Sequence, residues 1–308
     1  MVRYIIKRLF IGVVTIWALI TITFFLIRIM PGSPFEADNL SQSAIEQLES
    51  TYGLDEPMWK QYILYMENLM HGDLGISYKK NVSVNTLIAR GFPYTLSIGL
   101  LSIAVSAFIG ILMGIWMATS KRLAVKNTLL GIATLGVSIG VSIPGFVTAI
   151  LLMMIFGVWW PVLPIVGLGS PANYILPVAA QSFGQIASIA RLTKSTYSEA
   201  IQMDYVTMAR AKGLSNLYIT ARHVLKNALI PVVTYFGPAI AFLITGSFVV
   251  ESIFSIPGIG REFTNAITNR DYTVVLGFSV FIGVIITVAN LAVDIICSLI
   301  DPRIKLTN

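Results

Sequence analysis

The sequence predicts an all-α integral membrane protein with six transmembrane helices, and three observations point to this class. Only 12% of the 308 residues are charged, whereas an ordinary soluble domain carries about 25%. Several long runs contain no charged residue and are long enough to cross a hydrocarbon core of about 30 Å as a helix. The basic residues gather in alternate connections between these runs. A soluble enzyme, a disordered chain and a nucleic-acid-binding protein are therefore excluded as the main class.

The uncharged runs locate the spans. Four runs each fit one helix: Leu9–Ile27, Thr95–Ser120, Asn227–Val250 and Tyr272–Val293. A fifth run, Asn127–Ala190, is 64 residues long and exceeds one span. Because prolines stop helices, the four prolines in its middle divide it into two helices near residues 129–158 and 174–192. Within the first of these helices, Pro144 and Gly145 are expected to kink or break the span.

The basic residues set the orientation of the chain. With six spans, 14 of the 21 lysines and arginines fall on one side of the membrane. The positive-inside rule places this side, with both termini, in the cytoplasm. The predicted organisation is a cytoplasmic N-terminus (1–8), a first transmembrane helix (9–30), an extracytoplasmic helical segment (31–93) and a helical core (94–308). The core contains a basic cytoplasmic loop at residues 193–226.

The segment between the first two spans is expected to form short helices. Ser43 and Glu46 match a capping box at the start of one helix. After Pro57, apolar residues recur at helical spacing until Gly72, which is expected to end a second helix. Two roles fit this segment: a lid over the outer helix ends, or a docking surface for an extracellular partner. Beyond the fifth span, Ser255–Gly260 is expected to form a tight turn or a short re-entrant piece.

The cytoplasmic loop contains one further short helix. Asp204 is expected to cap it and Gly213 to close it at C′, where a left-handed backbone favours glycine. Helical spacing would put Tyr205, Met208, Ala209 and Lys212 on one face. The pattern leaves two interpretations open. The helix either lies on anionic lipid through its basic residues, or forms a rigid knob that binds a cytoplasmic protein.

The order of several motifs resembles the permease subunits of ABC importers. Asp204–Leu214 followed by His223–Pro231 is similar to the signature loop of these permeases, in the form typical of the dipeptide and oligopeptide group. Further matches to the OppB/DppB-type first permease of that group are Pro31–Pro34, Gly53–Pro57, Gly72–Ser77, Tyr94–Leu96, Glu251–Gly260 and Arg270–Tyr272. The general importer signature has Glu-Ala-Ala where this chain has Thr207, Met208 and Ala209. It has a proline at the position of Lys226, and the nearest proline here is Pro231.

The resemblance implies the type I importer permease fold and a role in peptide uptake into a bacterial cell across its inner or plasma membrane. The implied partners are a homologous second permease, two cytoplasmic ATPase subunits, an extracellular or periplasmic substrate-binding protein, membrane lipid and a peptide substrate, with no nucleic acid. No cofactor is implied on this chain, because ATP and Mg belong to the partner ATPases. The sequence accordingly has no Gly-x4-Gly-Lys-Ser/Thr phosphate loop, and we expect a non-catalytic subunit. Permeases of this group for nickel chelates or glycosides, and a self-contained six-helix carrier, are the alternatives.

The resemblance also assigns roles to residues. The ATPase-coupling helix comprises Asp204, Tyr205, Thr207, Met208, Ala209, Arg210, Ala211, Lys212 and Gly213. Support for the coupling loop is assigned to His223, Asn227 and Pro231. An outer turn near the substrate-binding protein or a gate contains Glu251, Pro257, Gly258 and Gly260.

Overall fold

The structure is a computed structural model that describes residues 2–29, 34–35, 41–120, 124–244 and 248–300. The regular secondary structure within these residues consists of helices. One isolated β-bridge joins Ile76 to Ser83. Some sequence features used above lie outside the described residues. They are positions 31–33 of the first quoted motif and the basic residues Lys121, Arg122, Arg303 and Lys305.

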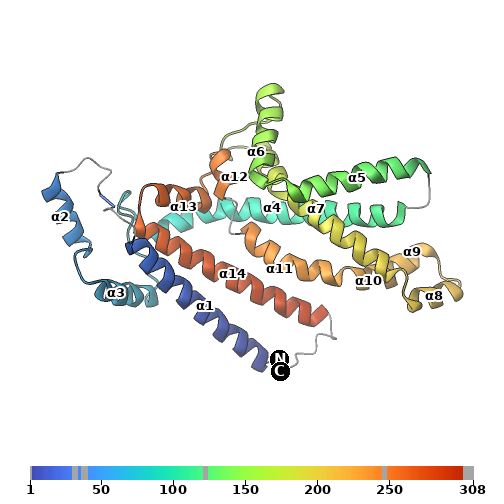
Figure 1. The fold of residues 1–308 in the computed structure, drawn as a ribbon, viewed down its shortest axis with the longest axis horizontal. Helices are drawn as coiled ribbons and strands as arrows, with labels where there is room; N and C mark the ends of the chain where they lie inside the picture. The colour runs from blue at the N-terminus through green and yellow to red at the C-terminus, as the bar shows by residue number, and fades with distance from the viewer. Residues whose placement is uncertain (1, 30–33, 36–40, 121–123, 245–247, 301–308) are drawn as a thin grey trace.

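Long helices form the body of the molecule (Figure 1). They are α1 (Val2–Ile29), α4 (Val84–Thr119), α5 (Ala124–Ser142), α7 (Ile175–Ala200), α11 (Ile230–Ile244) and α14 (Tyr272–Ile300). α4 packs along α7, while α14 packs against both α1 and α11. The α4–α7 contact is close because α4 presents glycines: a Cβ on Gly110 would lie 2.8 Å from Ile189, and one on Gly114 2.5 Å from Thr193.

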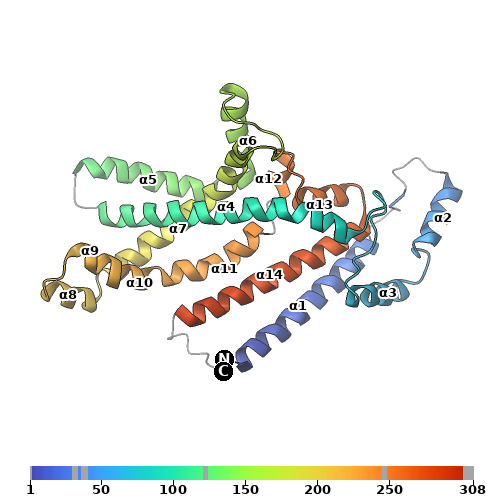
Figure 2. The same cartoon turned by 180° about the vertical axis from the view of Figure 1, so that it is seen from behind.

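Shorter elements fill the connections. They are α2 (Gln42–Thr51), α3 (Met58–Met70), α6 (Gly145–Met153), η3 (Met154–Trp159), η4 (Pro171–Tyr174), α8 (Asp204–Ala211), α9 (Asn216–Ile219), η5 (Thr220–Val224), α10 (Leu225–Ala228), α12 (Phe248–Ile253) and α13 (Ile259–Thr268). Figure 2 shows α8 and α9 at one end of the long helices and α2 and α3 at the opposite end.

Three helices among the described residues are long and apolar enough to cross a membrane: Ile6–Ile29 in α1, all of α4, and Tyr272–Val293 in α14. The pair Leu130–Ser142 and Gly145–Trp159 adds a fourth if the two count as one broken span. The class of an integral membrane protein is therefore confirmed by these apolar helices. The count of six spans and the side on which the termini lie stay predictions.

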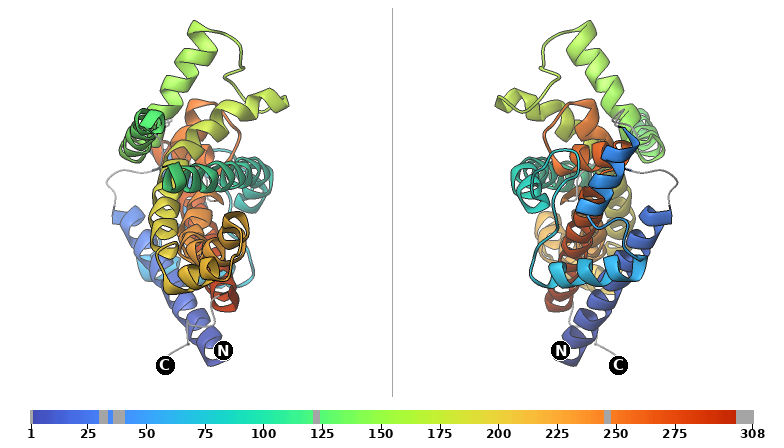
Figure 3. Two further views of the ribbon diagram at one scale, coloured as in Figure 1. Left: turned by 90° about the vertical axis from the view of Figure 1, so that its right-hand side faces the viewer. Right: turned by 90° about the vertical axis from the view of Figure 1, so that its left-hand side faces the viewer.

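The expected interruption of the third span is confirmed. α5 ends at Ser142, α6 begins at Gly145, and the two helices meet at 109°. Pro144 is the N-cap of α6, with an extended backbone, because the proline ring excludes the i→i−4 hydrogen bond that would continue α5. α6 consequently leaves the bundle that α5 follows, as the end-on views of Figure 3 show.

The segment after α1 contains the two expected helices, with one correction. Ser41, not Ser43, caps α2, and its Oγ accepts a hydrogen bond from the Ala44 amide at 3.4 Å. α3 begins directly after Pro57, and the chain turns at Gly72 with φ of +77°. α3 packs on the end of α1, where Arg28 Nε donates to Gln61 Oε1 at 2.7 Å.

Candidate functional site

The C-terminal end of α7 carries a small folded unit, which we call the knob (residues 201–228). Its elements are α8, α9, η5 and α10. They enclose a buried cluster that also includes the last turns of α7: Tyr197, Ala200, Val206, Ala209, Ile219, Val224 and Ala228. Tyr197 OH lies 3.2 Å from Thr220 Oγ1, and Tyr205 OH donates to the Ala200 carbonyl at 3.3 Å. The knob is therefore attached to α7 by packing and hydrogen bonds.

The end of α8 confirms the role predicted for Gly213. Gly213 has φ of +75° and donates its amide to the Arg210 carbonyl at 2.9 Å, and Leu214 donates to the Ala209 carbonyl at 3.3 Å. These two bonds form a Schellman motif, in which the C′ residue takes a left-handed backbone. No atom lies within 4 Å of a Cβ placed on Gly213, so the backbone conformation, not crowding, favours glycine there.

The start and the faces of α8 differ from the prediction. Met203 is the N-cap, so Asp204 is the first helical residue and makes no side-chain cap. Its carboxylate still lies in the first turn, where the helix dipole favours a negative charge. Ala209 is only 5% exposed and packs inward with Val206, whereas Met208 is 60% exposed. Ala209 therefore belongs to the core of the knob, and the predicted common face with Met208 is wrong.

The outer surface of the knob is apolar and basic. Thr207, Met208, Arg210, Ala211 and Lys212 of α8 and its C-cap are exposed. Leu217 of α9 is 81% exposed, and Tyr218 beside it contacts the His223 ring edge-on, with centroids 5.9 Å apart. An open hollow of about 540 Å³ is lined by Ala221, Arg222, His223, Lys226 and Asn227. The structure thus brings His223 and Asn227 into the knob, while Pro231 lies in the first turn of α11.

At the other end of the molecule, Glu251 of α12 anchors the outer turn. The side chain is 2% exposed and accepts hydrogen bonds from Thr95 Oγ1 at 2.8 Å, the Gly260 amide at 2.8 Å and the Arg261 amide at 3.2 Å. Thr95 Oγ1 in turn accepts from the Ile259 amide at 3.0 Å. Burial raises the pKa of the Glu251 carboxyl, and the hydrogen bonds offset part of that rise. One carboxylate therefore joins α4, α12 and α13.

Close packing explains why glycine occupies two positions assigned to this turn, Gly258 and Gly260. A Cβ on Gly258 would lie 2.6 Å from Thr95 Oγ1, and one on Gly260 2.7 Å from the Phe248 ring. Both positions require the close approach that only glycine allows. The turn itself is tight, with Ser255 at φ of +51°. Pro257 is exposed.

A second buried carboxylate, Asp271, was not among the predicted site residues. It is 3% exposed, accepts from Ser77 Oγ at 2.5 Å and from the Tyr78 amide at 3.2 Å, and precedes α14. Lys80 and Glu262 form an ion pair nearby. Two of the motifs that match the peptide-importer permeases, Gly72–Ser77 and Arg270–Tyr272, thus contact each other, although 194 positions separate Ser77 from Asp271.

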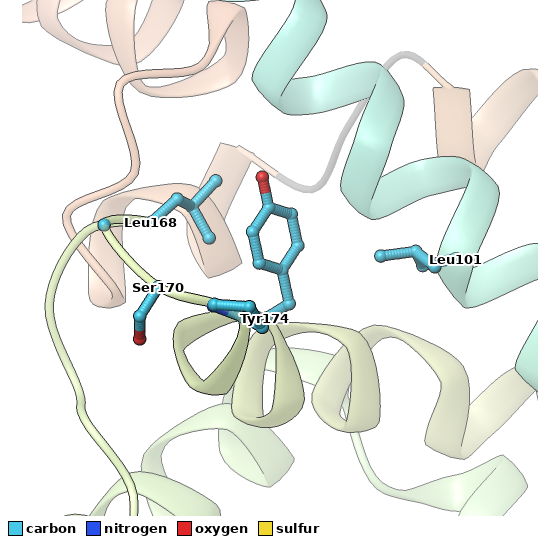
Figure 4. Close-up of a pocket in the computed structure, with 6 residues that line it drawn as sticks. Leu101, Leu168, Ser170 and Tyr174 are labelled. Atoms are coloured by element: carbon cyan, nitrogen blue, oxygen red, sulfur yellow. The ribbon is translucent and has the colours of Figure 1, made fainter.

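The loop after η3 lies against the outer turn. The Gly167 amide donates to the Phe254 carbonyl at 2.9 Å, which ties this loop to the outer turn. Asn173 holds the loop from inside through its Nδ2, which donates to the Val166 carbonyl at 2.8 Å. A cavity of about 370 Å³ opens here, and Figure 4 shows the Tyr174 ring between Leu168 and Leu101. Among the described residues, no group of three or more His, Cys, Asp or Glu side chains is placed to hold a metal ion.

Comparison with solved structures defines the class of fold. A chain of the MetNI methionine ABC transporter, in an inward-facing conformation, superposes with a TM-score of 0.56 over 70% of this chain and 96% of that chain, at 19% identity. A chain of an amino acid ABC transporter with histidines gives a TM-score of 0.51 over 71% and 95%, at 20% identity. The fold is therefore that of an ABC importer permease, as expected from the sequence.

The sequence comparisons show the family. Residues 110–306 match the family described as binding-protein-dependent transport system inner membrane component, and residues 1–99 match its N-terminal family. The chain belongs to this family of binding-protein-dependent transport system inner membrane components. It is 40% identical to the dipeptide transport system permease protein DppB of Bacillus subtilis, over 99% of both chains. It is also 40% identical to the oligopeptide transport system permease protein OppB of Haemophilus influenzae, over 99% of this chain and 100% of that protein.

Proposed function

We propose that this chain is the transmembrane permease subunit of an ABC importer for dipeptides or oligopeptides. It forms the translocation pathway together with a homologous second permease. The observation that carries the proposal is the identity of about 40% to dipeptide and oligopeptide permeases, which extends over 99% of this chain. The length compared includes the knob and the Glu251 turn.

The knob is the proposed contact with a cytoplasmic ATPase. Its exposed surface combines Met208 and Leu217 with Arg210 and Lys212, so a partner with an apolar groove and an acidic rim would complement it. Its buried cluster and the Schellman end of α8 make it a packed unit that moves with α7. Closure of two ATPases on ATP would therefore displace α7 as well as the knob.

The energy source lies on other chains in this proposal. This sequence contains no Gly-x4-Gly-Lys-Ser/Thr loop, so ATP and Mg bind the partner ATPases and this subunit is non-catalytic. A substrate-binding protein outside the membrane would deliver peptide to the end that carries the Glu251 turn. The knob and α2–α3 lie at opposite ends of the long helices (Figure 2). A cytoplasmic knob therefore supports the proposal that residues 31–93 lie outside a bacterial inner or plasma membrane. The positive-inside rule supports a cytoplasmic location for both termini.

The test is co-expression with the genes that neighbour this one, followed by purification and reconstitution. We expect a second permease and ATPase subunits to co-purify with this chain. Proteoliposomes that contain the complex and the binding protein should take up labelled dipeptides or longer peptides only when ATP is supplied to the ATPase side. Uptake of nickel chelates or glycosides in place of peptides would assign a different substrate. Uptake by the purified chain alone would identify a self-contained carrier and refute the proposal.

A further inference from the structure

A cavity of about 290 Å³ lies beside the break between α5 and α6. The break contributes Ile143, Gly145 and Phe146 to its wall, and α7 contributes Gln181 and Gln185. Ligand pockets for small molecules measure about 300–1,000 Å³, so this cavity has room for a short segment of a larger molecule. We call it the glutamine cavity.

The glutamine cavity lies at the depth of the apolar helices. Ser182, next to Gln181 in the sequence, donates its Oγ to the Ser102 carbonyl of α4 at 3.2 Å. Ser102 lies inside α4, which is one of the helices long and apolar enough to cross a membrane. Non-helical backbone at this depth is tolerated only where protein covers it or where it lines a water-filled cavity. The break fits this rule because Ile143 and Gly145 line the cavity.

The backbone at the break is open to the cavity. Helix ends leave amide and carbonyl groups without partners within the helix, and two helix ends meet here. No atom lies within 4 Å of a Cβ placed on Gly145, although Gly145 is in the cavity wall. A hydrogen-bonding molecule can therefore approach the backbone at this position.

The polar side chains of the cavity are two amides. Gln181 and Gln185 lie four residues apart and so share a face of α7, and the other residues of the wall are apolar or glycine. Tyr235 of α11 donates its hydroxyl to Gln185 Oε1 at 2.8 Å, which fixes the orientation of that amide. No residue of the wall carries a charge.

These groups match the main chain of a peptide. A primary amide offers both N–H donors and a carbonyl acceptor, which is the same chemistry as the peptide group itself. A wall without charge does not distinguish acidic from basic side chains. We propose that the glutamine cavity binds the main-chain amide groups of a peptide during passage, and that Gln181 and Gln185 make the contacts. This inference rests on the proposed function and adds the residues that contact the substrate.

The test uses the complete transporter in proteoliposomes with its binding protein. Tripeptides that differ only in a central Ala, Lys or Glu report on the role of substrate charge. Gln181→Leu and Gln185→Leu should each lower the uptake rate about tenfold for all three peptides, while the ATPase activity stimulated by the binding protein stays within about twofold. The matched control is Ser188→Ala on the same helix, because that hydroxyl donates to the Gly184 carbonyl of its own helix at 3.0 Å. It should leave uptake unchanged.

A second variant separates contact with the substrate from a structural role. Gln185→Glu keeps an oxygen that accepts from Tyr235 but adds a negative charge to the wall. The ratio of Lys-peptide to Glu-peptide uptake should rise at least about fivefold, which a merely structural residue would not cause. Unchanged uptake in both leucine variants, or an unchanged ratio in Gln185→Glu, would overturn the inference. A wild-type complex that takes up no peptide would instead refute the proposed function, because that failure appears without any substitution.

Discussion

Replacement of Gly213 tests whether a rigid end of α8 is needed for ATPase binding. The backbone there has φ of +75°, and the left-handed conformation costs an ordinary L-residue about 1–2 kcal/mol. Because a Cβ at this position would touch nothing, Gly213→Ala adds backbone strain without a clash. A cost of that size shifts the equilibrium between the closed and frayed helix end by roughly 5–30-fold. Gly213→Val should have a larger effect, and Gly213→Asn a smaller one because asparagine tolerates this conformation.

The assay has two readouts on the purified complex: amide hydrogen exchange of residues 204–214 and the amount of ATPase that co-purifies with the permease. Exchange should increase in the order Asn, Ala, Val, and ATPase recovery should fall in the same order. The control is Gly131→Ala in α5. A Cβ at Gly131 also has no atom within 4 Å, and the backbone there is helical, so alanine adds no strain. Both readouts should match the wild type. Wild-type exchange and ATPase recovery in Gly213→Val would refute the argument that this helix end must be rigid.

Four further results are expected. Met208→Asp should weaken ATPase co-purification about tenfold without changing amide hydrogen exchange in the knob. Ala209→Trp should reduce ATPase co-purification and also increase amide hydrogen exchange, because Ala209 packs inward and overpacking costs about 1–3 kcal/mol. Glu251→Gln should lower the free energy of unfolding by about 1–3 kcal/mol, measured by thermal melting, because an amide cannot accept all three hydrogen bonds. In a cysteine-free background, an impermeant reagent added outside the cell should label a cysteine at Ser50 and miss one at Ser215; the reverse would contradict the topology. The chain alone should hydrolyse no ATP. The complex should hydrolyse ATP, and the rate should rise when binding protein and peptide are added.

Features that depend on local backbone chemistry were predictable from the sequence. Gly213 ends α8, Gly72 follows α3, and Pro144 interrupts the third span, because each residue restricts or frees its own dihedral angles. The cap of α2 was misplaced by two residues, since Ser41 and Ser43 carry the same side chain and only the geometry distinguishes them.

Features that depend on distant contacts were not predictable. Which side of α8 is covered depends on Ile219 and Val224, which follow the helix and pack against Ala209. The position of the helix is therefore predictable from the sequence, but its buried face is not. Two hydrogen bonds join segments that no periodicity in the sequence connects: one between Ser77 and Asp271, and one between Gly167 and Phe254. The buried role of Asp271 was missed for this reason.

α7 is one unbroken helix that reaches both the knob and the glutamine cavity, so a tilt of α7 would move its two ends in opposite directions. α4 contacts α7 closely between these two ends, at Ile189 and at Thr193, so α7 could tilt about a point near Ile189. With a rise of about 1.5 Å per residue, Gln181 lies about 12 Å to one side of Ile189 and Ala200 about 16 Å to the other. A tilt of about 5° around this point would therefore swing Ala200 by about 1.4 Å and Gln181 by about 1 Å in the opposite direction. A hydrogen bond is made or broken by a change of that size. If the knob binds an ATPase and the glutamine cavity binds peptide as proposed, a movement of the knob would strengthen or weaken the contacts of Gln181 with the peptide.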